Sequence, residues 1–128
     1  MRLQDEMYVI EQSNDTGAML RLNAEHLIYK AHFPGNPITP GVCLMQIVTE
    51  LLQIRLQERL TLNQIINLKF VAPVSPKRYP TIDVKFSPIA NNDSEVKAKG
   101  TIQSGETILT KFSLVFQKNN KTVWKELK

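Results

Sequence analysis

The feature that most constrains the fold is a long apolar segment that follows a proline-rich stretch. From Thr39-Pro40 to about Leu60 the sequence predicts one helix, with Thr39 as the N-cap and Pro40 at the first helical position. Apolar side chains cover a wide arc of this helix: Val42, Leu44, Met45, Ile47, Val48, Leu51, Leu52, Ile54 and Leu56. Such a helix must be enclosed by other protein, either by a sheet curled around it or by a partner subunit.

The rest of the chain is rich in β patterns. Six segments are expected to be strands: 7–12 and 18–23, which form a hairpin, and 64–71, 81–87, 94–103 and 106–117. Alternate residues of the last three are expected to face the helix: Ile82, Val84, Phe86, Val96, Ala98, Gly100, Ile102, Ile108, Thr110, Phe112, Leu114 and Phe116. Residues 24–41 hold three prolines and two glycines, which predicts an irregular loop and no helix. The sequence therefore predicts an α+β fold, in which an antiparallel sheet wraps one long central helix and residues 1–128 form a single domain.

Composition excludes several classes of protein. A net charge of +4 without a basic run argues against nucleic-acid binding. No stretch approaches the roughly 20 apolar residues of a membrane span, and no signal peptide is evident, so a cytoplasmic protein without a membrane partner is expected. Cys43 is the single cysteine and is expected to be a small buried side chain rather than an activated thiolate. No metal site or cofactor is predicted.

The residues that carry chemistry lie just before the helix. The segment His32-Phe33-Pro34-Gly35-Asn36-Pro37-Ile38-Thr39-Pro40-Gly41-Val42 resembles the signature of the 3-hydroxyacyl-acyl-carrier-protein dehydratases, in which HFPG, a proline pair and PGV lead into the buried helix. The strand Ile66-Asn67-Leu68-Lys69-Phe70 and the loop Pro73-Val74-Ser75-Pro76 also match this family. The resemblance covers most of the chain. It implies a hotdog fold and a dimer with a thioester tunnel at the subunit interface, in which the histidine and the helix carboxylate of each site come from different subunits.

The resemblance also implies roles for individual residues. Removal of water from a 3-hydroxyacyl thioester needs a base for the C2 proton, an acid for the leaving hydroxyl, and donors on the thioester oxygen. His32 matches the family's base. Phe33, Pro40, Gly41 and Val42 are expected to bind the substrate, and the N–H groups of Gly41 and Val42 can polarise its carbonyl from the first helical turn.

One departure from the family pattern concerns the acid. The family has Glu or Asp four residues after the valine of PGV and often Gln one turn later, whereas this chain has Gln46 and then Glu50. An amide cannot deliver a proton to a leaving hydroxyl. Both residues belong to one stripe of the helix, so the leading hypothesis is that Glu50 is the acid, directly or through a water held by Gln46. The alternative is that Glu50 is a structural residue, hydrogen-bonded in the dimer interface.

Three functions follow from these residues. The first is a dehydratase of 3-hydroxyacyl thioesters in fatty-acid or polyene-type chain synthesis, which uses His32, Glu50 and Gln46. The second is a hotdog thioesterase in which Gln46 orients the attacking water. The third is a non-catalytic acyl-thioester binding partner of an active homologue. The expected partners are an acyl-carrier-protein or coenzyme A thioester and a second copy of the chain in a homodimer, with further assembly of dimers left open.

Overall fold

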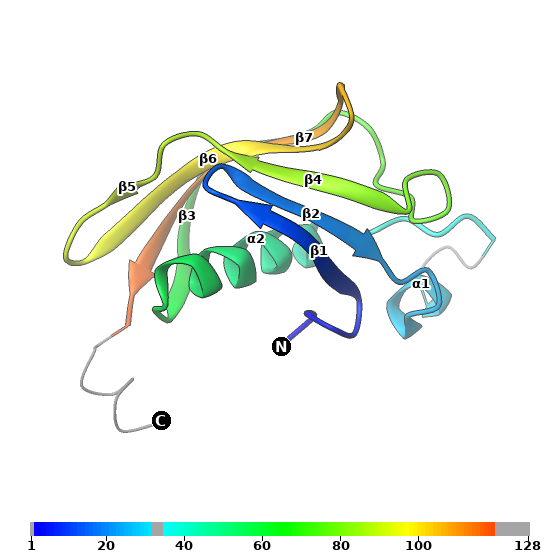
Figure 1. The fold of residues 1–128 in the computed structure, drawn as a ribbon, viewed down its shortest axis with the longest axis horizontal. Coiled ribbons are helices and arrows are strands. Elements are labelled where there is room, and N and C mark those ends of the chain that lie inside the picture. The colour runs from blue at the N-terminus through cyan, green and yellow to red at the C-terminus, as the bar shows by residue number, and fades with distance from the viewer. Residues whose placement is uncertain (1, 32–34, 120–128) are drawn as a thin grey trace.

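The computed structural model describes residues 2–31 and 35–119, and within them an antiparallel sheet curls around one long helix (Figure 1). The elements follow the chain as β1 (Tyr8–Asn14), β2 (Gly17–Leu22), α1 (Leu27–Ala31), α2 (Gly41–Leu56), β3 (Leu60–Phe70), β4 (Thr81–Phe86), β5 (Ala90–Asn91), β6 (Glu95–Ser104) and β7 (Thr107–Lys118). The order in the sheet is β1-β2-β4-β6-β7-β3, and β5 pairs with β6. Every pair is antiparallel, so the predicted α+β architecture is confirmed.

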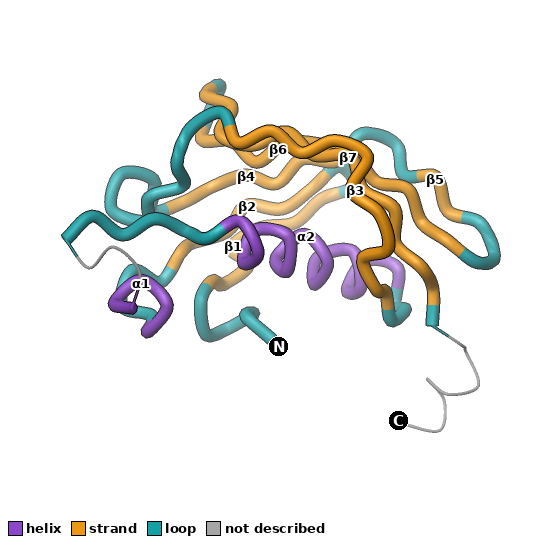
Figure 2. Tube along the Cα trace, turned by 180° about the vertical axis from the view of Figure 1, so that it is seen from behind, coloured by secondary structure: helices purple, strands orange, loops and turns teal. Residues whose placement is uncertain are grey.

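The core lies between α2 and the concave face of the sheet, which Figure 2 shows from behind. Leu44, Ile47, Val48 and Leu52 of α2 are at most 2% exposed. The strand residues predicted to face the helix are buried in ten cases: Ile82, Val84, Phe86, Val96, Ala98, Ile102, Thr110, Phe112, Leu114 and Phe116. The sheet therefore encloses the apolar helix, as its pattern requires. Among the described residues no helix is long and apolar enough to cross a bilayer.

The prediction that Ile108 faces the helix is wrong. Ile108 is only half-buried, and its neighbour Leu109 is fully buried in the core. The register between β6 and β7 shifts at this point, so that Gln103 pairs with Ile108. Leu109 is therefore the extra residue of a β-bulge, and its carbonyl accepts the N–H groups of Val71 (2.8 Å) and Ala72 (3.1 Å). Strict alternation fails here because the bulge adds a residue to one strand.

Two element boundaries also differ from the prediction. The helix ends at Leu56, because Gln57 is left-handed (φ 52°, ψ 45°) and turns the chain back. The next strand begins at Leu60, whose N–H donates to Gln53 Oε1 at 3.0 Å. The predicted helix end near Leu60 and the predicted strand start at residue 64 are therefore wrong. The short strand β5 (Ala90–Asn91) lies between the predicted strands 81–87 and 94–103 and was not predicted.

The segment 24–41 contains a short helix, which corrects the expectation of an irregular loop without helix. Its start is stabilised by His26, whose Nδ1 accepts the N–H of Ile28 at 3.1 Å. Its centre is fixed by Tyr29, which is 1% exposed. The prolines lie outside Leu27–Ala31, so they do not prevent a single turn of helix there.

Candidate functional site

The loop that leads into α2 is fixed by Thr39, which is 4% exposed. Its N–H and its hydroxyl both donate to the carbonyl of Val74, each at 2.8 Å, and Tyr29 Oη lies 2.8 Å from its Oγ1. Because the Thr39 hydroxyl proton goes to Val74, the Tyr29 hydroxyl is the donor to Thr39. The predicted N-cap role of Thr39 is wrong: Pro40 holds the N-cap position, and no side chain caps the helix. Thr39 instead joins this loop to the loop between β3 and β4, in which Val74 lies.

The first turn of α2 places two backbone donors at the surface. Cys43 and Leu44 direct their N–H groups to the Pro40 carbonyl, at 3.0 and 3.1 Å. The N–H groups of Gly41 and Val42 have no acceptor among residues 2–31 and 35–119. Unpaired N–H groups at a helix start carry partial positive charge and can bind an oxygen that gains negative charge. The predicted substrate-binding residues Pro40, Gly41 and Val42 thus form the N-terminal end of α2.

An apolar groove of about 660 Å³ runs from this helix start between α2 and β3. Its lining comprises Gly41, Val42, Met45, Gln46, Thr49, Leu60, Thr61, Leu62, Ile65, Leu68 and Phe70. Val42 is 73% exposed and Phe70 53% exposed, although both are apolar. None of these described lining residues is titratable. The groove therefore suits an acyl chain, and Gln46 is its longest polar side chain.

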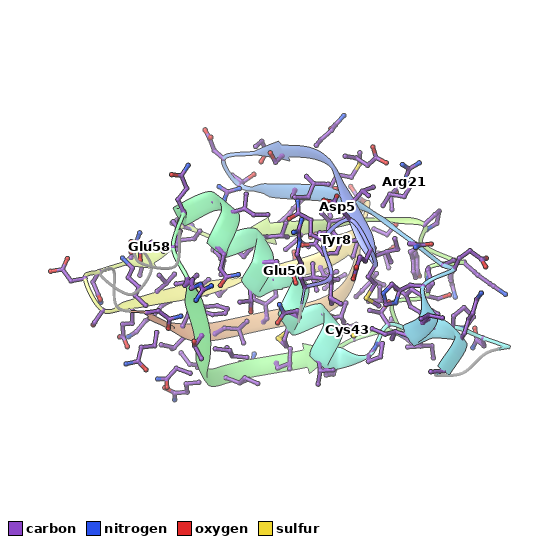
Figure 3. All side chains as sticks on the ribbon, turned by 90° about the horizontal axis from the view of Figure 1, so that it is seen from below. Asp5, Tyr8, Arg21, Cys43, Glu50 and Glu58 are labelled. Atoms are coloured by element: carbon purple, nitrogen blue, oxygen red, sulfur yellow. The ribbon has the colours of Figure 1, made fainter. Side chains whose placement is uncertain are left out.

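Gln46 and Glu50 lie one turn apart and are hydrogen-bonded: Gln46 Nε2 donates to Glu50 Oε2 at 2.8 Å. Glu50 is only 6% exposed. It accepts three further hydrogen bonds, from Leu3 N (2.8 Å), Gln4 N (2.8 Å) and Tyr8 Oη (2.9 Å). Figure 3 shows Glu50 on α2 facing the segment that carries Tyr8. Glu50 thus joins the N-terminal segment to the helix within one chain.

These surroundings change the pKa of the Tyr8 phenol. It is fully buried. Burial raises the pKa of Tyr8 above its ordinary value, and the nearby charge of Glu50 and the hydrogen bond to it raise that pKa further. Tyr8 is therefore a permanent proton donor to Glu50 over the physiological pH range.

The structure places the remaining predicted residues as follows. Cys43 is 3% exposed, and burial raises the pKa of its thiol, so it is a buried side chain as predicted. His32 and Phe33 lie outside the described residues, between the end of α1 at Ala31 and Gly35. Their roles stay predictions.

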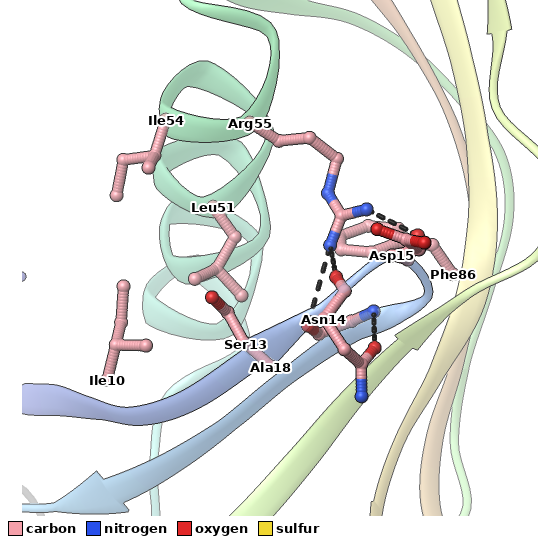
Figure 4. Close-up of a pocket in the computed structure, with 10 residues that line it drawn as sticks. Ile10, Ser13, Asn14, Asp15, Ala18, Leu51, Ile54, Arg55 and Phe86 are labelled. Atoms are coloured by element: carbon pink, nitrogen blue, oxygen red, sulfur yellow. Dashed lines mark hydrogen bonds between the residues drawn. The ribbon is translucent and has the colours of Figure 1, made fainter.

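A second cavity, of about 370 Å³, lies near the C-terminal half of α2 (Figure 4). Arg55 crosses it and donates to the carbonyls of Asn14 and Asp15, each at 2.5 Å. Its guanidinium also lies 5.9 Å from the centroid of the Phe86 ring. Arg55 therefore clamps the β1–β2 hairpin to the helix, and its donors are engaged by the fold.

The sequence did not predict the residues that fix the site by long-range hydrogen bonds. Tyr8 and the backbone of Leu3 and Gln4 meet Glu50 across at least 42 residues of chain. Tyr29 and Thr39 form a second buried pair. The buried tyrosines gave a weak signal, because a phenol inside a protein usually needs a hydrogen-bond partner.

Comparisons with known proteins agree with this architecture. The sequence profile of the ApeI-like family, described as ApeI dehydratase, matches residues 9–108. A curated 3-hydroxyacyl-[acyl-carrier-protein] dehydratase FabZ from Fusobacterium nucleatum is 30% identical over 93 residues, which are 69% of this chain and 64% of that protein.

Solved structures show the same fold. A chain of the dehydratase heterocomplex ApeI:P from Xenorhabdus doucetiae matches with a TM-score of 0.59 and 20% identity, over 88% of this chain and 98% of that chain. A mutant of a hypothetical thioesterase from Streptococcus pneumoniae TIGR4 matches with a TM-score of 0.63 and 14% identity, over 91% of this chain and 93% of the other. The predicted hotdog fold is confirmed. With the profile match over most of its length, the chain belongs to the ApeI-like family of hotdog-fold dehydratases.

Proposed function

We propose that this chain removes water from 3-hydroxyacyl thioesters and forms trans-2-enoyl thioesters. The observation that carries the proposal is the position of the Gly41 and Val42 N–H groups at the start of an apolar groove. A thioester oxygen bound to these donors directs its acyl chain into the groove. The donors then stabilise the negative charge that develops on that oxygen when the C2 proton leaves. The substrate is carried on an acyl carrier protein or on coenzyme A.

The elimination can be written with His32 as the base. His32 takes the C2 proton, the electron pair forms the C2–C3 double bond, and the C3–oxygen bond breaks. The hydroxyl leaves as water once it gains a proton. No redox step and no cofactor is needed, because the reaction only moves one proton and one hydroxide.

Two versions of the proposal differ in the group that gives a proton to the leaving hydroxyl. In the first, Glu50 supplies it directly or through a water held by Gln46. In the second, Glu50 is a positioning residue and the imidazolium of His32 returns the proton it has just taken. Four donors already point at the Glu50 carboxylate, so a proton on it would displace one of these hydrogen bonds. This arrangement supports the second version.

We also propose that the working form is a dimer, which in the simplest case is a homodimer. The strand β3 lies at the edge of the sheet and has no partner on its outer side among the described residues. It carries the exposed apolar residues Ile65 (49% exposed) and Ile66 (56% exposed), which an isolated edge strand would usually avoid. Pairing of two β3 strands would cover them and bring two grooves to the interface.

The test is hydration of a crotonyl thioester by the wild-type chain and by three variants. His32→Ala should abolish activity. Glu50→Gln should abolish it if Glu50 is the acid, and should leave a measurable rate if Glu50 only positions Gln46. An inert wild-type chain that gains activity in Gln46→Glu would refute dehydratase action and support the third function, a non-catalytic binding partner.

That binding-partner function has one observation in its favour: the described lining of the groove contains no carboxylate. An active homologue could then supply the missing acid in a heterodimer. The dehydratase ApeI:P of Xenorhabdus doucetiae is a heterocomplex. Mixing the chain with such a homologue should raise the dehydration rate above that of either protein alone. Release of free thiol from acyl thioesters would instead support the thioesterase alternative.

A further inference from the structure

We propose that Gln46 selects acyl groups that carry a hydroxyl at C3, and that Glu50 sets this preference by fixing which atom of the Gln46 amide faces the groove. The inference rests on the proposed function, because it concerns the same groove and the same class of thioester. It adds a specificity residue, Gln46, and a positioning residue, Glu50.

The orientation of the amide follows from its hydrogen bond. Gln46 Nε2 donates to Glu50 Oε2 at 2.8 Å. If the amide were reversed, its oxygen would face a carboxylate oxygen, and neither atom would carry a hydrogen to share. Oε1 of Gln46 is therefore the end of the amide that is turned away from Glu50.

Glu50 cannot adapt to a reversed amide. It is 6% exposed and is held from the other side by Leu3 N, Gln4 N and Tyr8 Oη. These three donors belong to the N-terminal segment and to β1, so the carboxylate is fixed by parts of the fold that lie outside the groove. A fixed acceptor in turn fixes its donor, Gln46.

The orientation of the Gln46 amide matters because the side chain lies between two cavities. Its side chain borders the apolar groove of about 660 Å³ on one side and, on the other, a polar cleft of about 510 Å³ that is lined by Glu50. Within the groove its neighbours along the helix include Val42 and Met45, whose side chains are apolar, and Thr49, whose hydroxyl already donates to the Met45 carbonyl at 2.8 Å. An acyl chain in the groove would exclude water, and a hydroxyl buried there without an acceptor is costly.

A C3 hydroxyl can donate to this oxygen, whereas a C3 methylene cannot. An amide oxygen accepts two hydrogen bonds, so the proposal does not depend on the other contacts of Gln46. The same contact distinguishes substrate from product: a 2-enoyl chain has lost the hydroxyl and with it the donor. The family's carboxylic acid at this position is replaced here by a group that recognises the hydroxyl without protonating it.

The experiment compares the binding of two unreactive ligands, S-(3-hydroxybutyl)-coenzyme A and S-butyl-coenzyme A, by isothermal titration calorimetry. Both are thioethers, so neither can be dehydrated or hydrolysed. The wild-type chain should bind the hydroxylated ligand roughly fivefold more tightly, the effect of about one net hydrogen bond. Gln46→Leu should bind both ligands equally. Glu50→Gln should lose most of the preference, because an amide at position 50 accepts either orientation of Gln46.

Tyr8→Phe is the matched control. Tyr8 donates to Oε1 of Glu50, whereas Gln46 donates to Oε2. Tyr8→Phe should therefore lower the melting temperature, as Glu50→Gln should, and yet keep the preference for the hydroxylated ligand. A loss of preference in Tyr8→Phe as large as that in Glu50→Gln would overturn the positioning role, because general loosening would then explain both.

Absence of any preference in the wild-type chain, or a preference that survives Gln46→Leu, would overturn the inference as a whole. Neither ligand reports on turnover. A chain that prefers the hydroxylated thioether but never releases water from a 3-hydroxyacyl thioester would contradict the proposed function alone. A chain that releases water without this preference would contradict the inference alone.

Discussion

The ring of Phe70 lies directly against the backbone of Gly41: a Cβ atom at position 41 would come within 2.7 Å of Phe70 Cζ. This contact joins the edge strand β3 to the first turn of α2. A side chain at position 41 would have to displace this ring. The glycine of the PGV segment therefore allows Phe70 to pack against the start of α2.

Gly41→Ala should displace the Phe70 ring or the helix start. Because the ring is half exposed and can move, the loss of stability should be about 1–2 kcal/mol, while the rate of crotonyl thioester hydration should fall at least tenfold. Thermal unfolding and the hydration assay measure the two effects. In the double variant Gly41→Ala/Phe70→Leu most of the stability should return, and failure to recover any would show that the ring is not the obstacle.

High pH should destabilise the chain in part through Tyr8. Burial, the Glu50 charge and the hydrogen bond raise the pKa of Tyr8 in the folded state. Above about pH 10, the unfolded chain loses this phenolic proton while the folded chain keeps it. The stabilisation is thus complete below about pH 10 and is lost as the pH rises further. Urea unfolding at pH 8 and pH 11 should show a smaller loss in Tyr8→Phe than in the wild type, and equal losses would count against this account.

The Cys43 thiol should be unreactive in the folded protein. It is 3% exposed, and burial raises its pKa, so little thiolate forms at neutral pH and little of it is accessible. Iodoacetamide labelling followed by mass spectrometry should detect modification in urea but not in native buffer. Cys43→Ala should keep activity. Rapid labelling of the native protein would instead assign the thiol a chemical role.

Thr39→Val should loosen the loop before α2. The exchange removes the hydroxyl that bonds Val74 and Tyr29. The Val74 carbonyl keeps the backbone N–H of residue 39, but the buried Tyr29 hydroxyl is left unpaired, and the total cost should be about 2 kcal/mol. Tyr29→Phe removes only the second contact and should cost about 1 kcal/mol. Chemical denaturation should show the larger loss of unfolding free energy in Thr39→Val. A larger loss in Tyr29→Phe would contradict the central position of Thr39.

A charge on the outer strand should prevent dimer formation. Ile66→Lys places an ammonium group on the exposed part of β3, where a second β3 would have to bury it. Analytical ultracentrifugation should show a dimer for the wild type and a monomer for the variant, with loss of activity. Lys69→Ala, on the same strand, is the control and should leave the dimer intact. A monomeric wild type would refute the proposed assembly.

The sequence predicted the enclosed helix and most of the inward-facing strand residues because their periodicity is local. It failed at Ile108 and Leu109, where a bulge changes the register, and at Gln57, whose left-handed backbone ends the helix early. Such features depend on neighbouring strands and turns, which periodicity along one segment does not describe.

The candidate site was likewise predictable only in part. The motif identified Gly41, Val42 and Gln46 in advance, and the structure brings these three to one groove. The partners of Glu50 could not be predicted, since two of them are backbone N–H groups that any sequence would supply. Thr39 was assigned a local capping role, but a carbonyl 35 residues away takes its hydroxyl.

The place of β7 in the sheet has a consequence for how the chain acquires its structure. It is the last of the strands among the described residues, yet it lies between β6 and β3, so β3 has no neighbour in the described sheet until β7 has been synthesised. The groove between α2 and β3 therefore depends on the pairing of β3 with β7. Folding has to bring residue 60 to residue 118, and contacts this distant in sequence are expected to make it slow.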